Sequence, residues 1–313
     1  MHVTAKAPVN IALIKYWGKQ DEDKVIPYNS SLSLSLDNLY TITTLSSADN
    51  FSFALNGKEV DGVERDKVYE FLLNFASIEE VNKTKVVSRN FVPTAAGLAS
   101  SASGFAALSK AANTFYKTNY DLQKLAQITR LGSGSACRSL LGAFVAWDKN
   151  GEVYQVNSKV KDFVMISVVV DSNKKLVSSR EAMKRSVLTS PSFDYFVSES
   201  NKDFDELINS LSQGDIEKIG NLTLKSFLLL HGTMLSSMPP ILYMNQDSIK
   251  VIELTEELRS QNIYAYPTMD AGSNVKILSL ESHYNEVIKV LKQNGFNNLF
   301  VSRPGRGAMI IDE

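Results

Sequence analysis

Apolar and polar residues alternate near the start of the chain, and this alternation predicts β-strands. Leu32 to Leu36 reads LSLSL, which puts leucines on one face of a strand and serines on the other. Similar patterns follow at Tyr40 to Ser47 and at Phe51 to Leu55. The pair Asn56-Gly57 after them is a strong hairpin signal. We therefore expect the first 55 residues to consist mainly of strands.

Helical spacing of apolar residues is interleaved with further strand patterns in the rest of the chain. In the middle we expect helices at Asp66–Phe75, Phe105–Phe115 and Leu122–Leu131, and strands at Lys85–Phe91, Gly142–Trp147 and Phe163–Asp171. Later we expect helices at Ser179–Ser186, Phe204–Leu211, Ile216–Leu229, Ser248–Gln261 and Tyr284–Gln293, and strands at Asn274–Leu280 and Asn298–Val301. Because no regular βαβ rhythm is present, we predict an α+β fold with two lobes, residues 1–175 and 176–313.

Composition narrows the class of protein. The chain has 313 residues, which is enough for about two domains of ~150 residues. Its 33 basic and 34 acidic residues give a net charge of −1, so bulk charge does not favour nucleic acid or an anionic membrane as a partner. A small anionic ligand in one cleft stays possible. With one cysteine, no signal segment and no apolar run of ~20 residues, the expected location is the cytosol.

The segment Pro93 to Gly104, PTAAGLASSASG, is the first candidate for chemistry. It lies between a predicted strand and a predicted helix and consists almost entirely of small residues. Small residues let a ligand approach the backbone, and a helix N-terminus offers unpaired N–H groups that suit phosphate. It is not a Walker A loop, because no Gly-Lys-Ser/Thr follows. The alternative is a small-residue helix packed tightly on a sheet.

The segment Lys15 to Lys19, KYWGK, is the second candidate. Two lysines flank an aromatic pair and a glycine after the strand-like Val9 to Ile14. Lysine suits phosphate as a point charge. The alternative is an exposed strand end with solvated lysines.

The segment Arg130 to Ser139, RLGSGSACRS, is the third candidate. Its serines and glycines offer hydroxyl and backbone donors at a helix start, and Arg138 would add a fork for a carboxylate or phosphate. Cys137 could be a nucleophile, but no histidine is near it in sequence. A lone cysteine among small residues is usually buried and inert.

Met269 to Val275, MDAGSNV, is the fourth candidate. Asp270 precedes Ala-Gly and a predicted strand, so it could act as a general base or orient a hydroxyl; the alternative is a turn aspartate. The three histidines show no metal spacing, and His231 is expected at a helix end or a pocket wall.

Six segments in order resemble the diphosphomevalonate decarboxylases of the GHMP superfamily. They are APVNIALIKYWGK, NSSLSLSLD, PTAAGLASSASG, GSGSACRS, HGTMLSSMPPILY and MDAGSNVKI, over about residues 4 to 310. The resemblance implies a ribosomal-protein-S5-like N-terminal lobe and a ferredoxin-like C-terminal lobe, with the active site between them. It implies ATP-dependent conversion of (R)-5-diphosphomevalonate to isopentenyl diphosphate, ADP, phosphate and CO2, with Mg²⁺, in a cytoplasmic homodimer.

The resemblance also implies roles for individual residues. Asp270 would be the catalytic acid/base on the 3-hydroxyl, Lys15 would face the transferring phosphate, and Arg138 would hold the carboxylate. Other substrate contacts would be Asn10, Tyr16, Trp17, Gly18, Lys19, Ser133, Gly134, Ser135, Ala136, Cys137 and Thr189. The ATP phosphate loop would include Pro93, Ala96, Gly97, Leu98, Ala99, Ser100, Ser101 and Ser103, with Ser101 near Mg²⁺.

Two positions depart from the family pattern. Ser273 stands where many relatives have proline, which would loosen the loop after Asp270. Pro191 follows Thr189-Ser190 where some bacterial relatives have an arginine that grips diphosphate, so that grip would be missing or would come from Arg65, Lys184 or Arg185. Two alternative functions remain: a GHMP kinase that phosphorylates a mevalonate derivative without decarboxylation, and a catalytically silent ligand-binding member.

Overall fold

The structure, a computed structural model, describes residues 1–92, 100–171 and 177–312. Within these ranges the strands form two main sheets and one hairpin. The larger sheet contains β1 (His2–Ile14), β4 (Ser31–Ser47), β5 (Ser52–Leu55), β6 (Lys58–Glu59), β7 (Thr84–Phe91), β8 (Phe144–Trp147), β9 (Val153–Val156) and β14 (Met309–Asp312). The smaller sheet contains β10 (Phe163–Val168), β11 (Tyr266–Thr268), β12 (Val275–Leu280) and β13 (Leu299–Ser302), and the hairpin joins β2 (Lys19–Asp21) to β3 (Ile26–Pro27).

The centre of the larger sheet is the long antiparallel pair of β1 and β4, in which Ile11 lies opposite Leu34. The strands predicted at Leu32–Leu36 and Tyr40–Ser47 are one continuous strand, β4. The alternation of leucine and serine is confirmed, and both kinds of side chain are fully buried, as at Leu34 and Ser33. The leucines pack into an apolar core, so the serines of β4 form a buried polar face.

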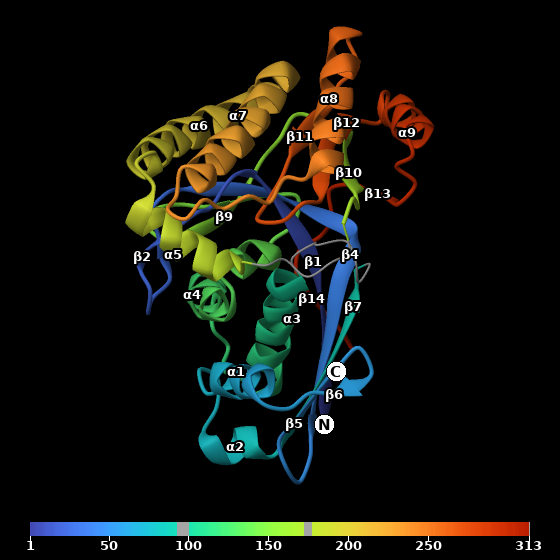
Figure 1. The fold of residues 1–313 in the computed structure, drawn as a ribbon. Helices are drawn as coiled ribbons and strands as arrows, with labels where there is room; N and C mark the ends of the chain where they lie inside the picture. The colour runs from blue at the N-terminus through green and yellow to red at the C-terminus, as the bar shows by residue number, and fades with distance from the viewer. Residues whose placement is uncertain (93–99, 172–176, 313) are drawn as a thin grey trace.

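Four helices cover one face of the larger sheet (Figure 1): α1 (Val63–Leu72), α2 (Ile78–Asn82), α3 (Ser100–Phe115) and α4 (Leu122–Gly132). The 3₁₀ helix η1 (Gly134–Leu140) follows α4 and packs against α3. In α3 the residues Ala106, Ala107 and Ala111 are fully buried. Their small side chains let the helix lie close to β1 and β4.

The smaller sheet is packed against α8 (Gln246–Ser260) and α9 (Tyr284–Gln293), and α6 (Phe193–Gln213) and α7 (Ile216–Leu235) lie side by side next to it (Figure 1). The shorter α5 (Ser179–Thr189) lies below them in this view. Among the described residues, no helix combines the length and apolar character needed to cross a membrane.

The two sheets share an apolar core. Ile11 and Leu34 of the larger sheet pack in one cluster with Met165 and Leu278 of the smaller sheet and with Phe204 of α6. The last strand, β14, returns to the larger sheet and pairs with β1, so the two ends of the chain lie close together (Figure 1). The lobes are therefore joined by packed side chains as well as by chain connections. Their division at residue 175 stays a prediction.

Most of the predicted helices and strands are confirmed, with shifted ends. The hairpin at Asn56-Gly57 joins β5 to β6, with a positive φ at both residues, and α9 has the predicted bounds. The helix predicted at Phe204–Leu211 is the second half of α6, which begins at Phe193. The middle of α6 is polar, and this interrupts the helical spacing of apolar residues that would have revealed the first half of the helix. The short strands β9, β11 and β14 were not predicted, because three or four residues show no clear period.

Two glycines of α7 allow a matched test of packing. A Cβ at Gly220 would lie 2.3 Å from the buried ring of Tyr266, whereas one at Gly232 would meet nothing within 4 Å. We expect Gly220→Ala to lower the free energy of unfolding by about 1–3 kcal/mol through overpacking. We expect Gly232→Ala to raise it by about 0.5–1 kcal/mol through helix propensity. Urea unfolding of both variants measures this, and equal effects would contradict the packing described.

Candidate active site

The end of β1, the turn after α4 and the loop between β11 and β12 meet at a cavity between the lobes. Its volume is about 170 Å³. Side chains from α5 and α7 close its other side. The lining includes Asn10, Lys15, Tyr16, Trp17, Ser101, Ser133, Gly134, Ser135, Arg138 and Asp270. The fold thus brings together residues of all four candidate segments.

Lys15 and Asp270 form an ion pair across this cavity. Lys15 Nζ donates to Asp270 Oδ1 at 2.8 Å and to the carbonyl oxygen of Ala12 at 2.9 Å. The Lys15 side chain is 1% exposed, while that of Asp270 is 42% exposed toward the cavity. Burial lowers the pKa of Lys15, and the Asp270 carboxylate opposes this only in part. The two charges come from different lobes, so the pair fixes the lobes relative to each other at the site.

A second lysine, Lys276 on β12, also lies beside the carboxylate. Its Nζ is 3.7 Å from Asp270 Oδ2 and donates to the carbonyl oxygen of Asn274 at 3.1 Å. Burial alone would raise the pKa of Asp270, but the ammonium groups of Lys15 and Lys276 outweigh it and hold that pKa well below its usual range. Asp270 is therefore a carboxylate at neutral pH.

Lys276 was not among the residues predicted for the site. One feature of the sequence could have identified it: Lys276 is a charged residue within the strand Val275–Leu280, in which every residue is buried. A charge in such a strand needs a partner. His231, expected at a helix end or pocket wall, is buried inside α7 and is not among the residues that line this cavity. Burial lowers its pKa to about 4, so the imidazole is neutral at pH 7.

The loop that carries Asp270 is held at its C-terminal end. Asn274 Oδ1 accepts hydrogen bonds from the main-chain N–H groups of Val170 and Asp171, at 2.8 and 3.0 Å. The carbonyl oxygen of Ser273, at the position where many relatives have proline, accepts a 2.6 Å hydrogen bond from Ser248 Oγ. These contacts fix the loop without a proline ring.

Arg138 is a fully buried cation whose contacts are hydroxyl groups. Its Nη1 donates to Ser31 Oγ at 2.5 Å, and its Nε donates to Ser33 Oγ. Burial lowers its pKa, but a guanidinium stays charged at neutral pH. Nearby, Asn10 Nδ2 donates to the carbonyl oxygen of Ser135 at 3.2 Å and to Ser139 Oγ at 2.8 Å. Asn10 therefore ties β1 to the start of η1.

Tyr16 and Trp17 line the cavity and each carries a buried donor. Neither Tyr16 Oη nor Trp17 Nε1 has a hydrogen-bond partner among the described residues. A Cβ at Gly134 would lie 2.9 Å from the Tyr16 hydroxyl, so only glycine allows the ring this close. Ala136 and Cys137 are fully buried, and burial raises the pKa of the Cys137 thiol to about 12. The thiol is therefore protonated, which does not suit a nucleophile.

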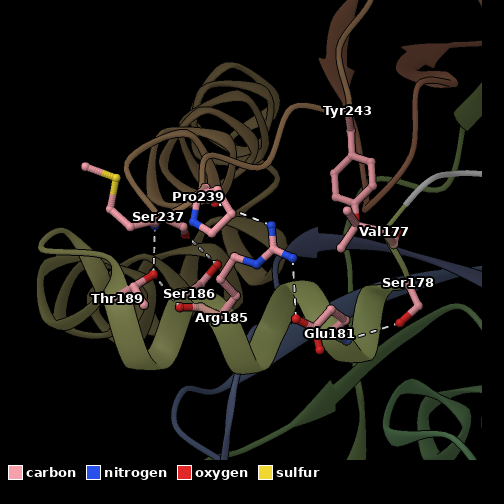
Figure 2. Close-up of polar contacts among 10 residues, drawn as sticks. Val177, Ser178, Glu181, Arg185, Ser186, Thr189, Ser237, Pro239 and Tyr243 are labelled. Carbon is pink, nitrogen blue, oxygen red and sulfur yellow. Dashed lines mark hydrogen bonds and ion pairs between the residues drawn. The ribbon is translucent and has the colours of Figure 1, made fainter.

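Five of the predicted substrate contacts do not line this cavity: the buried Ala136 and Cys137, and also Gly18, Lys19 and Thr189. Gly18 turns the chain with φ +86°, and a Cβ there would lie 2.8 Å from the ring of Phe193. Lys19 pairs with Glu22 at 2.7 Å in the β2–β3 hairpin. The hydroxyl of Thr189 donates to the carbonyl oxygen of Arg185 at 2.7 Å and accepts from Met238 N at 2.8 Å (Figure 2). Thr189 thus links the end of α5 to the loop after α7.

The cations considered as replacements for the missing arginine are partly engaged elsewhere. Arg185 lies 3.4 Å from Glu181 and donates to the carbonyl oxygen of Pro239 at 3.4 Å (Figure 2). Arg65 pairs with Asp66 at 3.0 Å. Lys184 on α5 is exposed.

Part of the predicted phosphate loop begins α3. Pro93, Ala96, Gly97, Leu98 and Ala99 lie outside the described residues, and Ser100 is the first residue of the helix. Ser101 Oγ is 3.4 Å from Ser133 Oγ, while Ser103 is buried and shares a 2.8 Å hydrogen bond with Thr41. Ser101 also lines a second cavity of about 240 Å³. The two cavities therefore meet at the start of α3.

The second cavity is lined by strands of the larger sheet, by α1 and by α3. Its lining includes Phe53, Glu64, Lys67, Asn90 and Phe105. Burial, with Arg180 and Lys19 nearby, lowers the pKa of Lys67. Within the described ranges no group of three or more His, Cys, Asp or Glu side chains could hold a metal ion.

The fold and the paired cavities define a two-lobed α+β enzyme of the GHMP kinase type. Residues 7–159 match the family model of the diphosphomevalonate decarboxylase-like N-terminal domain, and residues 164–300 match that of the mevalonate 5-diphosphate decarboxylase C-terminal domain. Diphosphomevalonate decarboxylase of Candida albicans is 37% identical over 312 residues, covering 91% of this chain and 86% of that protein.

Solved structures agree with this assignment. The crystal structure of mevalonate diphosphate decarboxylase from Staphylococcus aureus has a TM-score of 0.94 and 36% identity, covering 99% of this chain and 98% of that one. A structure of MDDEF in complex with MVAPP, AMPPCP and magnesium has a TM-score of 0.93 and 36% identity, covering 100% and 99%. The chain belongs to the diphosphomevalonate decarboxylase family.

The charges around Asp270 predict how its carboxylate titrates. In the wild type we expect no titration of Asp270 above about pH 4. Lys276→Met removes one cation, while Lys15, Arg138 and His231 stay in place, so the pKa of Asp270 should rise. Carbon-13 NMR of aspartate-labelled protein measures this, with the resonance assigned by its loss in Asp270→Asn. The control Lys250→Met removes an exposed lysine of α8 and should leave the midpoint unchanged. An unaltered midpoint in Lys276→Met would show that Lys276 does not stabilise the carboxylate.

Proposed function

We propose that this protein converts (R)-5-diphosphomevalonate and ATP to isopentenyl diphosphate, ADP, phosphate and CO2. The observation that carries the proposal is the ion pair of Lys15 and Asp270, with Arg138 in the same cavity. Three buried cations, Lys15, Lys276 and Arg138, surround one carboxylate, so the cavity suits a polyanion. Phosphoryl transfer requires that the acceptor hydroxyl and the phosphates of ATP bind next to each other. The two cavities meet at Ser101, so they can hold the acceptor and ATP side by side.

Asp270 acts on the 3-hydroxyl of the substrate. A tertiary hydroxide leaves poorly, so the hydroxyl first becomes a phosphate ester. A carboxylate held by two lysines is a weak base, so Asp270 orients the hydroxyl and accepts its proton as the new O–P bond forms. Lys15, which holds the other side of Asp270, offsets the negative charge of the transferring phosphate. The alternative role for Asp270, early deprotonation, is less suited to its low pKa.

Arg138 binds the substrate carboxylate. Departure of phosphate leaves positive charge on the tertiary carbon, and loss of CO2 supplies the electron pair that becomes the double bond. The guanidinium must therefore hold the carboxylate in line without overstabilising it. Asn10 supports this side of the cavity by fixing the start of η1.

The substrate diphosphate lies near Tyr16, Trp17, Gly18 and Lys19. The buried hydroxyl of Tyr16 and the indole N–H of Trp17 lack protein partners and can donate to phosphate oxygens. Ser133, Gly134, Ser135 and Arg138 form the opposite wall, with Ala136 and Cys137 buried behind them. Thr189 contributes at the edge of the diphosphate site.

ATP lies with its phosphates along the segment Pro93 to Ser103 and its base in the second cavity. The N-terminus of α3 is a suitable place for phosphate, because the N–H groups of a helix's first turn and the positive end of its dipole favour anions. Mg²⁺, when bound, neutralises phosphate charge. The hydroxyl of Ser101 fits as its one protein ligand, because the ion keeps phosphate and water oxygens and needs no acidic cage. A cytoplasmic homodimer remains part of the proposal, supported by the family resemblance, and sedimentation tests the oligomeric state.

The activity is tested by incubating the protein with ATP, Mg²⁺ and diphosphomevalonate while CO2, isopentenyl diphosphate and ADP are measured. We expect equimolar products. Asp270→Asn should lower kcat by about 10²–10⁴-fold and change the KM for ATP little. The control Asp205→Asn, an exposed carboxylate on α6, should behave as wild type. ADP without CO2 would favour a kinase, and no turnover would favour a silent binding protein.

A further inference from the structure

Buried arginine is normally paired with a carboxylate, and Arg138 is not. Among the described residues no Asp or Glu lies within ion-pair distance of its guanidinium. The side-chain partners of its guanidinium are the hydroxyls of Ser31 and Ser33, and its Nη2 group has no partner in the described part of the chain. The Arg138 side chain is 2% exposed and lines the cavity. An unpaired buried cation is costly, so the site is complete only when an anion binds there.

The two serines are held rigidly. They lie two residues apart on β4, about 6.8 Å along the strand and on one face of it. Ser31 is opposite Trp147 and Ser33 opposite Val145 on β8, and the strand is also paired with β1. The guanidinium of Arg138 also lies over the ring of Trp147, with Cζ 5.9 Å from the ring centroid. The strand thus holds two short acceptors at fixed places beside the arginine.

Hydroxyl acceptors have a different effect from a carboxylate. They satisfy two N–H groups of Arg138 and fix the plane of the guanidinium, but they do not neutralise its charge. A carboxylate in their place would compete with the ligand for the same cation. The serines therefore leave the full charge of Arg138 available to an anion in the cavity.

We infer that Ser31 and Ser33 are positioning residues that aim Arg138 at the carboxylate of the substrate. The inference rests on the proposed function. It assigns the specificity for a carboxylate-bearing substrate to the polar face of β4 as well as to Arg138.

The test compares two ligands on the same variants. Diphosphomevalonate carries the carboxylate, whereas isopentenyl diphosphate carries the diphosphate without it. We expect Ser31→Ala and Ser33→Ala each to weaken binding of diphosphomevalonate about tenfold by calorimetry, and the double variant to weaken it further. Binding of isopentenyl diphosphate and the KM for ATP should change less than about twofold. Ser33→Thr, which keeps the hydroxyl, should restore most of the affinity.

Ser35→Ala is the matched control. Ser35 lies on the same face of β4 and is equally buried, but its hydroxyl donates to the carbonyl oxygen of Leu141 at 3.1 Å and not to the arginine's site. It should bind both ligands as wild type does. Equal weakening of both ligands in the Ser31 and Ser33 variants, or no weakening of either, would overturn the inference. If wild type itself neither binds nor turns over diphosphomevalonate, the proposed function fails instead.

Discussion

The ion pair between Lys15 and Asp270 is the interaction on which the site depends. An ammonium group as deeply buried as that of Lys15 is costly unless a carboxylate meets it. Lys15 follows β1 in the larger sheet, and Asp270 lies between β11 and β12 of the smaller sheet. The carboxylate that satisfies the lysine therefore comes from the other lobe. Because the buried ammonium of Lys15 needs this carboxylate, the two lobes must meet with Lys15 and Asp270 in contact.

The shared core makes this arrangement precise enough for chemistry. Ile11 and Leu34 pack with Met165 and Phe204, so the end of β1 is fixed against the smaller sheet and α6. Asn274 and Ser273 hold the Asp270 loop from the other side. The shared apolar core fixes the two lobes relative to each other. Beside it, Lys15, Lys276 and Arg138 supply positive charge for a substrate with many negative charges. The net charge of −1 for the whole chain gives no sign of this local excess.

Patterns within a single segment could be predicted from the sequence. The leucine and serine alternation of β4, the hairpin at Asn56-Gly57 and the helix Tyr284–Gln293 depend on neighbours a few residues away. The residues Lys15, Arg138 and Asp270 could be singled out because each lies in a short segment of unusual composition, and the resemblance to the decarboxylases implied their roles.

Contacts between distant segments could not be predicted in this way. The serines of β4 are buried because Arg138, more than a hundred residues later, lies against them. Lys276 is part of an apolar strand pattern, and only its distance to Asp270 reveals its place in the site. β14 is too short to be recognised without β1 beside it. Each of these features depends on contacts between segments far apart in the chain. Hydrophobic periodicity within one segment carries no information about such contacts.

A double-mutant cycle on Lys15 and Asp270 tests the central claim most directly. The free energies of unfolding of Lys15→Met, Asp270→Asn and the double variant are compared with that of the wild type. Lys15→Met leaves the Asp270 carboxylate with Lys276, Asp270→Asn leaves both lysines without that carboxylate, and the double variant leaves Lys276 alone without it. The cycle therefore isolates the interaction of Lys15 with Asp270. The account predicts that the double variant is more stable than the sum of the single effects allows, by at least about 1 kcal/mol. Additive effects would contradict the claim that this pair holds the lobes and the site together.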